Sequence, residues 1–106
     1  MKRTLIYRPD ALFDLNEAER YTLAAWGRAQ AKLYVATLVA DIKALRVSAL
    51  RYPVQNDVFA GLRRKRSGMH HIYYLATESS VEVLNIIHVS RDPAQHLKVA
   101  TWQDDG

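Results

Sequence analysis

The chain has no cysteine among its 106 residues. This excludes a disulfide framework and any thiolate site for a metal or for nucleophilic catalysis, and it is typical of a reducing compartment. No apolar run approaches the roughly 20 residues that a membrane-spanning helix needs. The N-terminal stretch also lacks the apolar segment of a signal peptide. Together these absences predict a cytoplasmic protein with no membrane segment.

Acidic residues are in the minority, since 11 Asp and Glu stand against 15 Lys and Arg, for a formal net charge of +4. Such a balance favours acidic partners, either nucleic acid or an acidic protein. None of the acids lies between Asp57 and Glu78. That same interval contains the densest basic cluster, Arg63-Arg64-Lys65-Arg66. We therefore expect a charged contact surface there.

Few glycines and prolines interrupt the first half of the chain, and they mark the ends of its elements. Thr4–Tyr7 is a short run with strand composition. Pro9 suits the first turn of a helix, and the apolar spacing predicts a helix from there to Trp26. Gly27 ends it, and apolar residues spaced by three and four predict a second helix over Arg28–Leu50. The short break makes the two helices an antiparallel hairpin.

The second half changes to the alternating pattern of strands. Strands are predicted over Leu62–Arg66, His71–Ala76 and Val81–Val89, separated by turn residues. The order strand–helix–helix–strand–strand–strand predicts an α+β fold, with the helical hairpin packed on one mainly antiparallel sheet. The length fits a single domain spanning residues 1–106.

The last predicted strand is apolar on both faces. Strict alternation places Val83 with Ile87 on one face and Leu84 with Ile86 on the other. A strand with apolar side chains on both faces is expected inside the sheet and covered on both sides.

Four of the aromatic residues lie on or beside the helical hairpin or in the C-terminal tail. Tyr21, Trp26 and Tyr34 lie on or beside the helical hairpin, where we expect them to pack into the core or between the helices. Trp102 lies in the C-terminal tail. It can serve as an anchor for a partner or fold back over the sheet, and the sequence favours neither.

Alternation also divides the basic cluster. In a strand, Arg64 and Arg66 share one face, and Arg63 and Lys65 share the other. Such a cluster can neutralise phosphates or bind an acidic segment of a partner. The alternative is a solvated edge strand whose charges prevent edge-to-edge aggregation. We favour the partner-binding interpretation because both faces are charged and acids are missing nearby.

Four stretches of residues occur in an order and at spacings that are found together in one family. They are Arg8-Pro9-Asp10-Ala11 with Asp14-Leu15 and Tyr21; Trp26-Gly27 with Ala29-Gln30-Ala31 and Tyr34; Gly61-Leu62-Arg63-Arg64 with Gly68 and His70-His71-Ile72-Tyr73-Tyr74; and Val83-Leu84-Asn85-Ile86-Ile87-His88 with Arg91-Asp92-Pro93 and His96-Leu97. The whole resembles the ParE/RelE superfamily of type II toxin–antitoxin systems. The His-x-x-Arg-Asp-Pro ending favours the ParE branch. One departure is Lys65, where family members often carry an apolar residue.

The resemblance implies a toxin that binds DNA gyrase and is neutralised by a cognate antitoxin, ParD-like or another DNA-binding type. Toxin and antitoxin would form a hetero-oligomer, and DNA would be reached only through the antitoxin. An acidic antitoxin segment is a natural occupant of the basic strand. The residues expected to bind partners are Arg63, Arg64, Lys65, Arg66, His70, Arg91 and Trp102.

A RelE-like endonuclease that cuts messenger RNA on the ribosome is the enzymatic alternative. That reaction needs a base, an acid and cations that stabilise the phosphorane charge. His88, Arg91, Arg64 and Tyr73 are the candidates for these roles. The simpler interpretation of His88 is a packed or hydrogen-bonded residue at a strand end, and we favour it. A third possibility is an inactive relative that only binds its antitoxin.

No cofactor or metal site is expected. His70 and His71 are neighbours in a predicted strand, so their side chains point to opposite faces and do not share an ion easily.

Overall fold

The computed structural model of the chain describes residues 2–56, 58–93 and 97. It confirms the predicted α+β order, and every strand boundary lies within one residue of its predicted position. The second helix ends two residues early, and a short 3₁₀ turn continues it. The elements are β1 (Thr4–Tyr7), α1 (Pro9–Trp26), α2 (Arg28–Ser48), the 3₁₀ turn η1 (Ala49–Arg51), β2 (Arg63–Ser67), β3 (His70–Ala76) and β4 (Ser80–His88).

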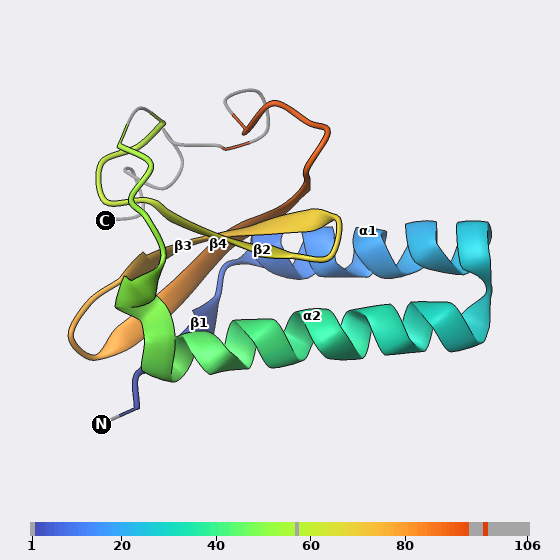
Figure 1. The fold of residues 1–106 in the computed structure, drawn as a ribbon, viewed down its shortest axis with the longest axis horizontal. Coiled ribbons are helices and arrows are strands. Elements are labelled where there is room, and N and C mark those ends of the chain that lie inside the picture. The colour runs from blue at the N-terminus through green and yellow to red at the C-terminus, as the bar shows by residue number, and fades with distance from the viewer. Residues whose placement is uncertain (1, 57, 94–96, 98–106) are drawn as a thin grey trace.

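The four strands form one sheet in the order β1-β4-β3-β2. β2, β3 and β4 are an antiparallel meander, whereas β1 lies parallel to β4, with Thr4 opposite Ser80 and Tyr7 opposite Val83. β4 is thus an inner strand, as its apolar residues predict. In Figure 1 the first strand lies beside the last one, although almost the whole chain separates them in sequence.

Both helices pack on one face of this sheet. Gly27, with a φ of 93°, makes the reversal between them, and its N–H donates to the carbonyl of Leu23 at the end of α1. The buried residues of α2 recur at spacings of three and four, and they meet the apolar residues of β3 and β4 in the main core. The Tyr74 hydroxyl donates to the carbonyl of Ala49 at 2.6 Å, which ties β3 to the end of α2.

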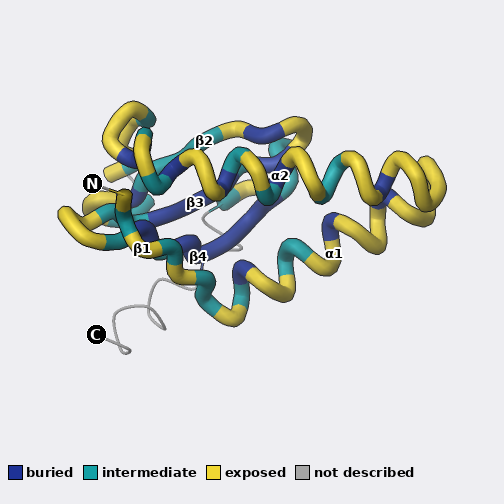
Figure 2. Tube along the Cα trace, turned by 90° about the horizontal axis from the view of Figure 1, so that it is seen from below, coloured by how far each residue is buried: buried dark blue, intermediate teal, exposed yellow. Residues whose placement is uncertain are grey.

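The far end of the helical hairpin extends past the sheet (Figures 1 and 2). Tyr21 is 65% exposed and Trp26 is 72% exposed, so the prediction that they pack into the core or between the helices is wrong. Tyr34 is half-buried against the main core, as predicted. The predicted helical spacing of the apolar residues is correct, but the sheet is too short to cover all of them.

The opposite face of the sheet has a second, smaller core. Leu62, Tyr73, Leu84 and Ile87 pack there with Leu97, and Val58 and Phe59 lie against them. Because Val83 and Ile86 belong to the main core instead, the predicted facing of β4 is wrong.

A β-bulge is the reason for this difference. Tyr73 pairs with Asn85 and Tyr74 pairs with Val83, so Leu84 is an extra residue in β4. One extra residue shifts the alternation of every side chain that follows it.

Candidate functional site

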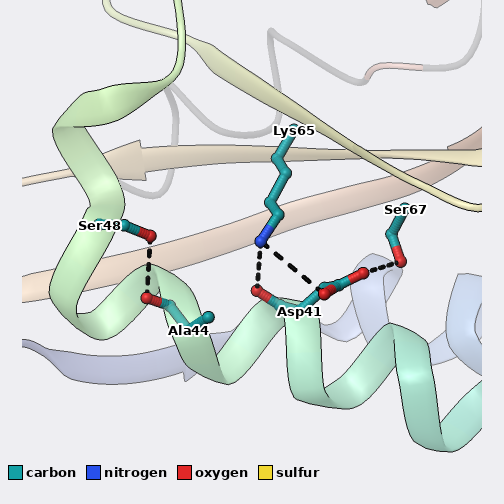
Figure 3. A network of polar contacts seen from close by, with 5 residues as sticks. All are labelled: Asp41, Ala44, Ser48, Lys65 and Ser67. Atoms are coloured by element: carbon teal, nitrogen blue, oxygen red, sulfur yellow. Dashed lines mark hydrogen bonds and ion pairs between the residues drawn. The ribbon is translucent and has the colours of Figure 1, made fainter.

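The basic strand β2 presents its four cations to two different environments. Arg63 and Lys65 point toward the helices (Figure 3 shows Lys65). Arg63 donates to the carbonyl oxygens of Tyr52 at 2.6 Å and Leu50 at 3.4 Å. Both hydrogen bonds of the guanidinium are to backbone carbonyls at the end of the helical hairpin. Arg63 therefore fixes the position of that segment.

Lys65 is the residue that departs from the family pattern, and it lies under α2. Its ammonium is 3.3 Å from the Asp41 carbonyl and 3.9 Å from the Asp41 carboxylate, and it lies over the ring of Tyr52. Ser67 donates to the same carboxylate at 2.6 Å. The ammonium of Lys65, whose side chain is 13% exposed, is compensated by the Asp41 carboxylate. Lys65 is therefore internal to the fold.

Arg64 and Arg66 lie on the opposite face of β2, as alternation predicts. His71 on β3 pairs in register with Arg66 and shares their face, where it makes an edge contact with the ring of Tyr73. Partial burial and then the charges of Arg64 and Arg66 lower the pKa of His71. These three side chains form one basic patch, named here the back-face patch.

His70 lies on the helix side, away from the back-face patch. Its Nδ1 is 2.6 Å from the hydroxyl of Tyr34, and that hydroxyl also accepts the N–H of Met69 at 2.9 Å. Burial, and then the neighbouring His88 and Arg91, lower the pKa of His70 to about 4. His70 is therefore neutral at pH 7, and Nδ1 accepts the Tyr34 proton. Its contacts tie the β2–β3 hairpin to α2.

A groove of about 440 Å³ lies between α1 and the end of β4. Asp10, Asp14 and Glu17 line it from α1, and His88 and Arg91 line it from the end of β4. The ring of His88 is 5.4 Å from that of His70 and 6.5 Å from that of Tyr21, and His88 Nδ1 contacts the Ser90 hydroxyl at 2.8 Å. The groove is thus mixed in charge.

Asp14 supports the sheet at the floor of this groove. β1 ends at Tyr7, so beyond Val83 the edge of β4 has no strand beside it among the described residues. One carboxylate oxygen of Asp14 accepts the backbone N–H of Ile86 at 2.9 Å and the amide of Asn85 at 3.0 Å. A side chain from α1 thus replaces the backbone acceptor that a longer β1 would supply.

The four candidate catalytic residues are divided between the two sides of the sheet. Arg64 and Tyr73 are register partners on the back face, and Tyr73 is only 1% exposed. His88 and Arg91 line the groove on the α1 side. The structure brings together the members of each pair but not the four. The sequence analysis assigned no role to His71, which lies beside Arg64 in the structure. The register of the β2–β3 hairpin was the signal that could have identified this residue.

Other sequence-based candidates are placed as follows. Trp102 lies outside the described residues. Within those residues no group of three or more histidines and acids is close enough to hold a metal ion. No helix in the described part of the chain is long and apolar enough to cross a membrane.

Comparison with known proteins gives three findings. A family model described as ParE toxin of type II toxin-antitoxin system, parDE, matches residues 5–93. None of the curated proteins compared with this chain matches it. The solved structures that are similar in fold include two toxin–antitoxin assemblies.

The first is the chromosomal ParDE system of P. aeruginosa, with a TM-score of 0.71 and 17% sequence identity over 82% of this chain and 96% of the other. The second is the RelBE2 complex of Mycobacterium tuberculosis, with a TM-score of 0.60 and 20% identity over 83% of this chain and 99% of the other. At such identities the likeness shows the fold alone.

Proposed function

Because this chain belongs to the ParE toxin family of type II toxin–antitoxin systems, we propose that it arrests growth by binding DNA gyrase and is neutralised by a cognate antitoxin. The toxin acts in the cytoplasm by occupying a surface of its target. It touches DNA only indirectly, through the antitoxin in the shared complex. The two solved structures described above are toxin–antitoxin complexes, which supports an antitoxin partner.

The observation that carries the choice of a binding toxin is the separation of the catalytic candidates. General acid–base cleavage needs its groups within hydrogen-bond reach of one phosphate. His88 and Arg91 lie on the groove side of the sheet, and Arg64 and Tyr73 lie on the back face. A nuclease built from these four residues has no common centre, whereas a gyrase-binding toxin needs none.

One observation favours the endonuclease as the second candidate. His71 lies beside Arg64 and Arg66, and its lowered pKa keeps it neutral near pH 7, as a general base must be. A RelE-like site on the back face would therefore use His71 in place of His88. An inactive relative that only binds its antitoxin is the third reading, and it predicts no growth arrest.

Expression of the chain alone, with and without the antitoxin, tests the proposal. Filamentation and induced DNA damage are expected, and the purified toxin should inhibit supercoiling by purified gyrase. A rapid arrest of translation with cleaved messages would contradict the gyrase target, and would be checked by incubating the toxin with programmed ribosomes. Normal growth with a folded protein would support the inactive relative.

A further inference from the structure

The free end of the helical hairpin carries large apolar side chains that remain in solvent. Trp26 is 72% exposed, and Leu23, three residues earlier in α1, is 47% exposed. Residues three apart in a helix are neighbours on its surface, so these two side chains lie side by side. The hairpin extends past the sheet at this end, which leaves both of them uncovered by the sheet (Figures 1 and 2).

These two side chains do not hold the helices of the hairpin together. The buried residues at this end are small, namely Ala18 and Thr22 on α1 and Ala31 on α2. The Thr22 hydroxyl donates to the carbonyl of Ala18 at 2.8 Å, so it is satisfied within its own helix. Small residues allow two helices to approach closely. The exposure of Leu23 and Trp26 shows that they lie outside this packing, so stability does not explain them.

The beginning of α2 is charged against the preference of a helix. Arg28 is the first residue of α2 and Lys32 follows four residues later, and both are exposed. The N-terminal end of a helix is the positive end of its dipole, which favours acids over cations. Like charges four residues apart also repel each other. The first turn of α2 contains no acid, and the sequence has no Asp or Glu from residue 20 to residue 40.

The four side chains of Leu23, Trp26, Arg28 and Lys32 are named here the hairpin tip. Residues that break a local rule of stability are expected at functional sites. Trp and Arg are also the residue types most enriched among those that dominate the binding energy of protein interfaces. The hairpin tip therefore combines an apolar anchor with a positive charge that its own fold does not compensate.

We infer that the hairpin tip anchors the toxin on its protein target. Trp26 and Leu23 enter an apolar pocket of the target, and carboxylates at the rim of that pocket pair with Arg28 and Lys32. This rests on the proposed function, which supplies a target protein that the toxin occupies. It goes further in naming the surface that binds and the chemistry that the target must offer.

A protein surface fits the hairpin tip better than a nucleic acid or a membrane. Affinity for nucleic acid grows with the number of phosphates neutralised, and the tip has two cations. Segments that recognise anionic membranes carry clusters of about four to eight cations. Neither alternative provides an enclosed apolar site beside a small number of acids. An apolar pocket with an acidic rim uses all four side chains.

The first experiment uses the intact toxin and purified gyrase. Trp26→Ala should raise the toxin concentration that half-inhibits supercoiling by about thirtyfold or more, the scale of a dominant interface residue. Val47→Ala is the matched control, because Val47 is an apolar residue of α2 that is 70% exposed at the other end of the hairpin. It should change that concentration by about twofold at most.

Arg28→Glu separates binding from stability. Glutamate at this position should raise the melting temperature of the toxin, because it suits the helix dipole and pairs with Lys32. The same change should raise the half-inhibiting concentration by about tenfold or more, because it places like charges opposite each other in the complex. Lys43→Glu, exposed on α2 away from the tip, is the charge control and should change inhibition by about twofold at most. A merely structural role of Arg28 would lower stability and inhibition together.

Circular dichroism checks the folding of each variant, and if Trp26→Ala does not fold, Arg28→Glu carries the test alone. Equal inhibition of gyrase by the wild type and both tip variants would overturn the inference and leave the proposed function in place. A wild-type toxin without effect on gyrase would contradict the proposed function, and growth arrest would then decide the inference, which requires the tip variants to be weaker toxins. Lost affinity for the antitoxin or for phosphatidylglycerol vesicles, with inhibition unchanged, would reassign the tip to that partner.

Discussion

The hydroxyl of Tyr34 on α2 lies 2.6 Å from Nδ1 of His70 on β3 and accepts the N–H of Met69 at 2.9 Å. This one oxygen therefore bridges the helical hairpin and the turn between β2 and β3. That turn sets the position of Arg66, whose guanidinium donates to the carbonyl of Gly68. The geometry of the back-face patch thus depends on a contact made on the other side of the sheet.

Removal of this hydroxyl should destabilise the protein. Tyr34→Phe leaves the buried Nδ1 of His70 without its donor, and a lost hydrogen bond of this kind costs about 1 to 2 kcal/mol. Urea denaturation of the isolated toxin measures the change. Tyr21→Phe is the matched control, because Tyr21 is 65% exposed, and it should change stability by less than about 0.5 kcal/mol. Equal effects of the two variants would contradict the bridging role.

Gly68 should tolerate alanine poorly. A Cβ built there would lie 2.8 Å from the ring of Tyr34, and the φ of 58° is unfavourable for an L-residue. Gly61→Ala is the control, since Gly61 has a φ of 81° but no atom within 4 Å of the added Cβ. Conformational strain alone costs about 1 to 2 kcal/mol, so Gly68→Ala should lose more than Gly61→Ala. Melting temperatures of the two variants decide this, and a smaller loss at Gly68 would show that Tyr34 moves aside freely.

Asp14→Ala should weaken the edge of β4. The substitution leaves the buried N–H of Ile86 without the carboxylate that accepts it, and an unsatisfied buried donor costs about 1 to 3 kcal/mol. Asp14→Asn keeps an acceptor oxygen and should lose less. Glu17→Ala serves as a surface control, because the exposed Glu17 carboxylate pairs with the exposed Arg20. Amide hydrogen exchange at Ile86 reports the effect directly, and unchanged protection in Asp14→Ala would exclude it.

His70 should make the stability of the toxin depend on pH. Its pKa in the folded state is about 4, lowered chiefly by burial from 6.5. Between pH 4 and pH 6.5, the unfolded state therefore binds a proton at His70 that the folded state does not bind. Stability should be constant above pH 6.5 and fall as pH drops toward 4, by at most about 3 kcal/mol from this group. Denaturation at several pH values should give a flatter profile for His70→Gln than for the wild type; identical profiles would refute the assignment.

His88→Gln should leave toxicity intact. His88 contacts the rings of His70 and Tyr21 and the hydroxyl of Ser90, so its role in the proposed binding toxin is structural. Growth after induction should be arrested to the same extent as with the wild type. Complete loss of toxicity in a variant that folds normally and still binds antitoxin would instead favour a nuclease that uses the groove.

The sequence predicted the element order well because local signals mark each element. Pro9 and Gly27 delimit α1, and the change from helical to alternating period marks the strands. The facing of β4 could not be predicted, because the bulge at Leu84 leaves no local signature in an apolar run. Exposure of Trp26 was missed for a related reason: the length of the sheet relative to the hairpin is a property of the tertiary fold.

The candidate site shows the same division between local and distant information. Alternation in β2 correctly paired Arg64 with Arg66, since it needs only neighbouring residues. It did not indicate which face would be internal, because the partner of Lys65 is Asp41, a residue on another element. His71 was overlooked because it is the pairing register of the β2–β3 hairpin that places it opposite Arg66. Distant partners decide which cations of the cluster remain uncompensated.

The parallel pairing of β1 with β4 also has a consequence for synthesis of the toxin. Thr4 pairs with Ser80, so the first strand has no neighbour in the sheet until the last one has been translated. At about 5 to 20 residues per second, the 76 residues from Leu5 to Ser80 take about 4 to 15 seconds to translate. During that interval the nascent chain does not complete its sheet. Any partner that recognises the complete sheet therefore binds the toxin only after this last strand has been translated.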